Sequence, residues 1–252
     1  MLKSELAPTL SENFTGIIWK VLLDNVTGFI AIESRNTELR QVSFSVLNYI
    51  TGERLIKELT VDEPWYSALA HIGNGHLFIN GYEYAGSPVS KGIIAIKIDN
   101  GATSWQQYNL SFYDAWNEGL RVYNPNISPR KFDMLEPETG KTIQVDNPTT
   151  ISTDLKLPEN GSETLIPSTV KHELIVGEIS HLSYRNLTII SFHESIDGYL
   201  RLRLVVHQDN NILLDIIIAD SIQKLQYETF FVQHNHLFCI QNTNRIVSYK
   251  LV

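Results

Sequence analysis

The fold is decided by residues 65–84, which read WYSALAHIGNGHLFINGYEY. Apolar runs flank the central Gly-Asn-Gly, and this arrangement predicts two β-strands joined by a tight turn. Residues 227–242, YETFFVQHNHLFCIQN, repeat the plan, because residues 74–79 align with residues 234–239. Looser copies begin at Trp19 and Glu178. The chain therefore contains a repeated hairpin.

A second kind of hairpin follows most copies of the first. Residues 41–48, QVSFSVLN, alternate cleanly, with Val42, Phe44 and Val46 on one face of a predicted strand. Gly or Asn supplies the positive φ that the connecting turns need. Hairpins of this kind occupy residues 40–59, 91–110, 130–145 and 199–218.

Two hairpins make a unit of four antiparallel strands, and a repeat of roughly 40–50 residues with this content is typical of propeller blades. We therefore expect an all-β chain, a β-propeller of about five four-stranded antiparallel blades in a single domain spanning residues 1–252. The blades are expected near residues 17–61, 65–110, 113–145, 172–219 and 226–252. A short helix is expected only around residues 220–226.

Three places depart from the repeat. The third blade is degraded, with two prolines, and residues 146–170 are polar and form an irregular insertion. The fifth blade lacks a fourth strand. Residues 14–24, FTGIIWKVLLD, are either the first strand of blade one or the missing strand of blade five. With either placement, the two chain ends meet near the first and last blades.

Composition excludes several classes of function. The net charge is −8 and no Lys/Arg cluster occurs, so we expect no nucleic-acid partner. No apolar run is long enough to span a bilayer, so no membrane partner is expected either. One cysteine and a start without an apolar export signal indicate a cytoplasmic protein.

The sequence QHNHLF at residues 233–238, followed by Cys239, looks at first like a metal site. However, His236 occupies the repeat position of His76, and Cys239 that of Ile79. We therefore expect a turn histidine, a small buried thiol and no metal. Phosphate loops, nucleophile elbows and zinc motifs are also missing from the sequence, and no cofactor is expected.

Residues 92–105, GIIAIKIDNGATSW, resemble the repeat of quinoprotein-like (PQQ-type) β-propellers, and residues 15–19, TGIIW, echo it. The resemblance implies a propeller but not the quinone, because the quinone-dependent dehydrogenases are exported and have more blades. The whole chain also resembles an uncharacterised bacterial protein family, chiefly from Bacteroidota, and that resemblance implies no activity.

The loops expected on one propeller face are aromatic and acidic, which suits a protein partner, a small molecule or a carbohydrate. The candidate binding residues are Trp65, Tyr66, Glu83, Tyr84, Asp114, Trp116, Arg121, His193 and Glu194. Either tryptophan can instead plug the central channel; we favour Trp116 as a site residue and Trp65 as a plug.

We expect a non-catalytic binding or interaction module. The alternative is a hydrolase or lyase that acts on a small ligand or carbohydrate, with acid–base groups drawn from Glu83, Asp114, His193 and Glu194. Gathering of these groups in one concave pocket would favour the enzyme.

Overall fold

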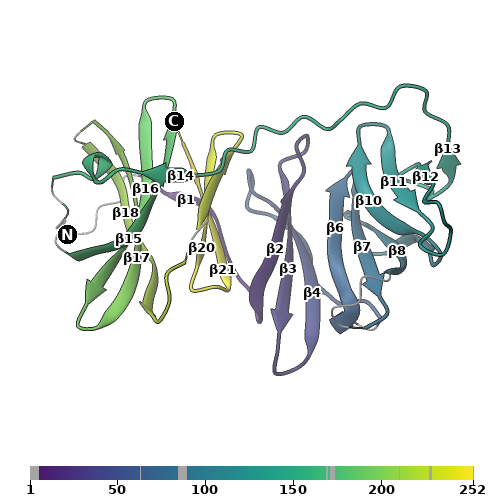
Figure 1. Ribbon diagram of the computed structural model, residues 1–252, viewed down its shortest axis with the longest axis horizontal. Helices are drawn as coiled ribbons and strands as arrows, with labels where there is room; N and C mark the ends of the chain where they lie inside the picture. Colours follow the sequence, from purple (N-terminus) through teal and green to yellow (C-terminus); the bar gives the residue numbers. More distant parts are fainter. Residues whose placement is uncertain are drawn as a thin grey trace. The chain divides into compact units, whose positions relative to one another are not determined.

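The computed structural model describes residues 6–62, 64–84, 90–168, 170, 174–209, 211–226 and 229–251. Within these ranges no α-helix is formed, and Pro64–Tyr66 (η1) and Glu163–Leu165 (η2) are single 3-10 turns. The strands form five antiparallel sheets (Figure 1). The expected all-β fold, with five sheets built like propeller blades, is confirmed.

The first two sheets are four-stranded meanders in which each strand pairs with the next along the chain. The first contains β2 (Ile17–Leu23), β3 (Phe29–Asn36), β4 (Gln41–Asn48) and β5 (Arg54–Leu59). The second contains β6 (Ser67–Gly73), β7 (His76–Tyr82), β8 (Ser90–Lys97) and β9 (Thr103–Gln107). Both match the predicted blades closely.

The third sheet is smaller, as its prolines suggested. It contains β10 (Ser111–Trp116), β11 (Gly119–Tyr123), β12 (Phe132–Leu135) and β13 (Thr142–Ile143). β12 has four residues and β13 only two. Asp114, Trp116 and Arg121, which the sequence analysis placed in loops, lie instead on the first hairpin of this sheet. A bulge between Phe112 and Asp114 breaks its apolar alternation and hid the strand.

The fourth sheet has five strands: β14 (Glu159–Gly161), β15 (Ile175–Tyr184), β16 (Leu187–Ile196), β17 (Tyr199–Gln208) and β18 (Asn211–Ile222). The insertion is thus partly ordered, because β14 pairs with β15. The helix expected at residues 220–226 is wrong. Residues 220–222 continue β18, with Ile222 opposite Leu200, and Arg201 holds the Asp220 carboxylate at 3.2 Å.

The fifth sheet contains β19 (Phe230–Gln233), β20 (His236–Gln241) and β21 (Arg245–Lys250), and its fourth strand is β1 (Pro8–Asn13). β1 pairs antiparallel with β21, with Pro8 opposite Tyr249 (Figure 1). Residues 17–23 form β2 in the first sheet, so the first of the two placements considered for residues 14–24 is correct. The expected meeting of the chain ends in one sheet is confirmed.

The chain divides into two compact units, residues 14–153 and residues 1–13 with 154–252. The first unit contains the first three sheets, and the second contains the other two. Each has its own apolar core, which includes Phe44 and Leu77 in the first and Phe192 and Leu204 in the second. That the two units form a single domain stays a prediction. No helix in the described ranges is long and apolar enough to cross a membrane.

Candidate binding site

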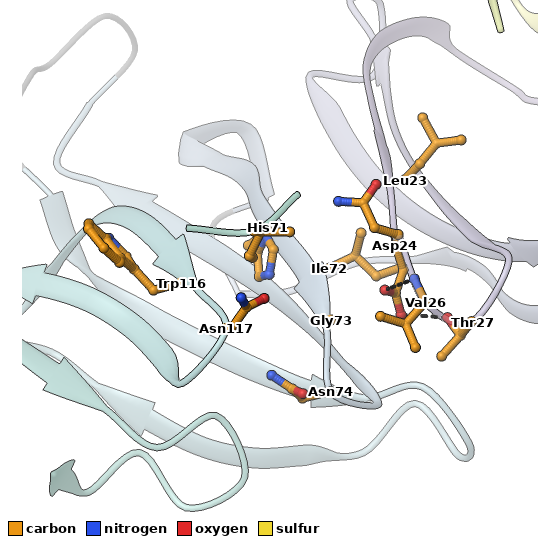
Figure 2. A pocket seen from close by; sticks show the side chains of 12 residues that line it. Leu23, Asp24, Val26, Thr27, His71, Ile72, Gly73, Asn74, Trp116 and Asn117 are labelled. Carbon is orange, nitrogen blue, oxygen red and sulfur yellow. Dashed lines mark hydrogen bonds between the residues drawn. The ribbon is translucent and has the colours of Figure 1, made fainter. Parts of the chain in front are cut away.

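Three turns of the unit formed by residues 14–153 surround a recess of about 220 Å³ (Figure 2). They join the first and second strands of consecutive sheets: β2 to β3, β6 to β7 and β10 to β11. We call this cavity the turn recess. It is lined by Leu23, Asp24, Asn25, Val26, Thr27, His71, Ile72, Gly73, Asn74, Trp116, Asn117 and Ile151.

The first turn is capped by Asp24, a side chain that is only 5% exposed. Its Oδ1 accepts a hydrogen bond from the Val26 N–H at 3.0 Å, and its Oδ2 accepts one from the Thr27 hydroxyl at 2.5 Å. Each oxygen keeps a second lone pair. Among the described residues, no Lys or Arg forms an ion pair with Asp24. Its negative charge is therefore uncompensated beside the recess.

The same turn recurs in the next hairpin of this sheet with an uncharged cap. Asn48 Oδ1 accepts hydrogen bonds from the Ile50 N–H at 3.0 Å and from the Thr51 N–H at 3.1 Å. A glycine with positive φ follows in both turns, at Gly28 (75°) and Gly52 (76°). The fold therefore needs a side-chain acceptor at position 24 but does not need a charge there.

The second turn contributes His71, near the end of β6. The imidazole stacks between two phenylalanine rings, Phe78 at 5.9 Å and 17° and Phe112 at 6.2 Å and 15°. Burial among these rings lowers the pKa of His71 to about 4, and the nearby Asp24 carboxylate only partly offsets this effect. The ring is therefore neutral at pH 7, with one N–H donor and one lone pair.

Gly73 keeps one ring nitrogen of His71 accessible. A Cβ at this position would lie 2.9 Å from His71 Nε2, so any larger residue would crowd that atom. Figure 2 shows the ring between Trp116 on one side and Ile72 and Asp24 on the other. No other described residue forms a hydrogen bond with this imidazole. The ring thus presents an uncommitted polar atom to the recess.

The third turn is held by the segment that follows the third sheet. Asn117 Nδ2 donates to Thr149 Oγ1 at 2.9 Å and to the Thr150 carbonyl at 3.2 Å. Glu118 accepts hydrogen bonds from the Thr149 hydroxyl and N–H at 2.6 and 2.9 Å, and these bonds lower the pKa of its carboxyl. With its nitrogen engaged, the Asn117 amide presents its oxygen to other partners.

Trp116, Asp114 and Arg121, three predicted site residues, lie together on the β10–β11 hairpin. Arg121 is opposite Asp114 and donates Nε to Oδ1 at 2.8 Å and Nη2 to Oδ2. The Trp116 indole N–H donates to the same Oδ1 at 2.8 Å. The guanidinium of Arg121 also lies over the Trp116 ring, 5.0 Å from its centroid. Asp114 is therefore engaged as an ion-pair partner.

The other predicted residues of this unit lie away from the turn recess. Trp65 and Tyr66 are in η1, before β6, at the opposite end of that strand from the turn. Trp65 packs against the apolar core, and Tyr66 lines a second recess of about 260 Å³. Glu83 is exposed and Tyr84 is 56% exposed. Trp65 and Trp116 consequently do not share a recess.

His193 and Glu194 belong to β16 in the other unit. Glu194 is 4% exposed and accepts a hydrogen bond from Arg203 at 2.7 Å, while Arg203 also contacts Asp215 at 2.6 Å. His193 Nε2 accepts the Gln226 N–H at 3.0 Å, and burial lowers its pKa. Since neighbours on a strand face opposite sides, the two do not form an acid–base pair.

The repeated histidines have equivalent surroundings. His76 Nδ1 is 2.8 Å from the Asn74 carbonyl, and His236 Nδ1 is 3.0 Å from the His234 carbonyl. Cys239 is fully buried in the core, and burial raises the pKa of its thiol to about 12. Its expected role as a small buried apolar residue is confirmed. In the part of the chain that the structure describes, no group of three or more potential metal ligands occurs.

The sequence analysis missed His71, Asp24 and Gly73. A histidine two residues before a Gly-Asn-Gly turn was the available signal, but its stacking depends on Phe112 from another sheet. Residues 23–105 match the family model of DUF4905, a domain of unknown function. That range includes these three residues, but Trp116 and Asn117 lie beyond it. The chain matches no curated protein.

Among solved structures, the chain is similar to BBS1N crystallised in complex with ARL6DN. With the mercury-soaked crystal the identity is 7% and the TM-score 0.39, covering 100% of this chain and 98% of that chain. With the lead-soaked crystal the identity is 11% and the TM-score is 0.28, and the match covers 100% of this chain and 68% of that chain. With a bifunctional GH43-CE protein of Bacteroides eggerthii the identity is 10% and the TM-score is 0.30. This match covers 99% of this chain and 34% of that chain. Similarities this low say nothing about ligand or activity.

Proposed function

We propose that the protein is a non-catalytic binding module that holds a small polar ligand in the turn recess. The observation that carries this proposal is the neutral His71 ring, which faces the recess without a hydrogen bond to any other described residue. The ring is partly exposed, so a ligand in the recess can reach its uncommitted nitrogen.

The dimensions and walls of the recess suit a ligand group of a few heavy atoms. Its volume of about 220 Å³ lies below the roughly 300–1,000 Å³ of sites that enclose drug-sized molecules. Apolar walls come from Leu23, Ile72 and Ile151, and polar atoms converge from Asp24, His71 and Asn117. The ligand is thus a small molecule, or one group of a larger ligand such as a protein partner.

Binding accounts for these groups better than catalysis does. A general base works best with a pKa near the operating pH, whereas that of His71 is about 4. Asp24 caps its own turn, and Asp114 is paired with Arg121. The hydrolase or lyase alternative therefore lacks a suitable general base in His71, and both aspartates are engaged in structural contacts. We also propose a cytoplasmic location, because a chain with a single cysteine suits a reducing compartment.

The proposal is tested by NMR with isotope-labelled protein and a fragment set that includes sugars, polyols, carboxylic acids and amines. We expect at least one class to shift the signals of turn-recess residues, and His71→Phe, which keeps the ring stack, to abolish the effect. Tyr66→Phe, in the second recess, is the matched control and should bind normally. The proposal fails when no class perturbs the turn recess at millimolar concentration, or when His71→Phe binds as the wild type does.

A further inference from the structure

We infer that the group bound in the turn recess is a primary ammonium, so that the ligand is a protonated amine. This inference rests on the proposed function and adds the chemical class of the ligand. It follows from two properties of the lining: an uncompensated negative charge, and polar atoms that mainly accept hydrogen bonds.

The charge comes from Asp24. Its carboxylate is 5% exposed, and none of the residues that line the recess is Lys or Arg. A carboxylate in such surroundings interacts strongly with an incoming cation, because little solvent screens the pair. The chain as a whole carries a net charge of −8, which also attracts cations from solution. An anionic ligand would be repelled by both.

The hydrogen-bonding capacity comes from one acceptor on each turn. Asp24 keeps a free lone pair on each oxygen, and the Asn117 amide has its nitrogen engaged and its oxygen available. The neutral ring of His71 adds a third acceptor, since no described residue fixes its tautomer. A primary ammonium has three N–H donors and no acceptor, which matches these three groups.

Other cations fit less well. A quaternary ammonium has no N–H donor and is usually held over aromatic faces, but Arg121 already lies 5.0 Å from the Trp116 ring centroid. A divalent metal ion needs several oxygen ligands, and the recess has one carboxylate. A planar guanidinium has five N–H donors, more than the four acceptor atoms of Asp24, Asn117 and His71 can satisfy with one bond each.

The experiment compares probes of matched shape. Butylamine, butan-1-ol and butyltrimethylammonium are titrated into labelled wild-type protein at pH 7 and low salt, and dissociation constants are taken from the shifts of turn-recess signals. We expect butylamine to bind at least tenfold more tightly than the other two. Its affinity should fall as salt is added, because the attraction to Asp24 is partly screened.

Two variants separate charge from shape. Asp24→Asn keeps a cap that the fold already uses at Asn48, so it should fold normally and lose at least tenfold in butylamine affinity. Asn36→Asp introduces a charge in the turn at the opposite end of β3, where Asn36 Oδ1 accepts the Leu39 N–H, and is the matched control, with little effect expected. Gly73→Ala retains the charge but crowds His71 Nε2, and should weaken butylamine binding as well. Melting curves establish that each variant is folded.

The outcomes distinguish the inference from the function on which it rests. Selective butylamine binding that Asp24→Asn removes and Asn36→Asp retains supports the inference. Equal binding of amine and alcohol, or butyltrimethylammonium binding as tight as that of butylamine, overturns it while the recess remains a binding site. If none of the three probes binds but fragments of another class do, the inference that the ligand group is an ammonium is also wrong. Failure of every class overturns both proposals.

Discussion

The pH dependence of stability provides a direct test of the environment assigned to His71. In the folded protein the pKa of this imidazole is about 4, against an ordinary value of 6.5. Below pH 6.5 the unfolded chain binds a proton at this position and the folded chain does not. The contribution of His71 to stability is therefore constant above that pH and falls as the pH is lowered towards 4.

The size of the effect follows from the same two values. Since one pH unit corresponds to about 1.36 kcal/mol, the interval from 6.5 to about 4 amounts to at most about 3 kcal/mol. His71→Phe should remove this dependence while keeping the stack on Phe78 and Phe112. The free energy of unfolding of the wild type, minus that of the variant, should therefore fall by up to about 3 kcal/mol between pH 7 and pH 4.

Urea unfolding followed by tryptophan fluorescence is well suited to this measurement. All four tryptophans lie between residues 19 and 116, so the signal reports the unit of residues 14–153, which contains His71. Taking the difference between the two proteins removes the contribution of the carboxylates that both share. A difference that stays constant from pH 7 to pH 4 would refute the reasoning, as would an NMR titration that places the pKa of His71 near 6.5.

Further tests address other parts of the chain. Arg203→Met should lower the free energy of unfolding by about 3–5 kcal/mol, because it leaves two buried carboxylates without their cation. The measurement is urea unfolding followed by far-UV circular dichroism, since the unit that contains Arg203 has no tryptophan, and a loss near zero would contradict the ion-pair assignment. Cys239→Ser should cost about 1–3 kcal/mol by the same assay through burial of a hydroxyl, and His236→Ala should leave the metal content unchanged by elemental analysis. Trp65→Ala should lower the free energy of unfolding by about 3 kcal/mol and leave amine binding unchanged, because Trp65 packs against the core. Trp116→Ala should weaken amine binding more than it lowers the melting temperature, because Trp116 lines the turn recess. Loss of amine binding in Trp65→Ala together with normal binding in Trp116→Ala would contradict both roles.

Strands were predictable from the sequence where the residues of the adjoining turn are typical of tight turns. Asn48 to Gly52 and Lys97 to Gly101 close turns with residues that tolerate the required backbone, so the hairpins around them were placed correctly. β1 was missed because residues 8–13 contain a proline and little alternation, and because the strand is stabilised by pairing with β21. β14 was also missed, because it lies in a polar segment and is stabilised by pairing with β15. Long-range pairing gives no local pattern.

The candidate site was only partly predictable. Aromatic and acidic residues drew attention to Trp116, which does line the turn recess, and to Asp114 and Arg121 beside it. His71 could not be recognised, since its altered pKa results from stacking on a ring of the third sheet. Within the insertion, Thr149 and Thr150 hold the third turn through hydrogen bonds with Asn117, which no local pattern in the sequence indicates. Such contacts depend on tertiary structure.

The pairing of β1 with β21 has a consequence for how the protein is made. Thr9 and Ser248 form a hydrogen bond across 239 positions of sequence, so β1 leaves the ribosome long before its partner β21. The fifth sheet can be completed only after β21 has been synthesised, and until then β1 has no edge on which it can dock. A circular permutant that joins Lys250 to Pro8 by a short loop, and opens the chain between β13 and β14, would turn this most distant contact into a local hairpin. Such a permutant should fold faster than the natural order allows.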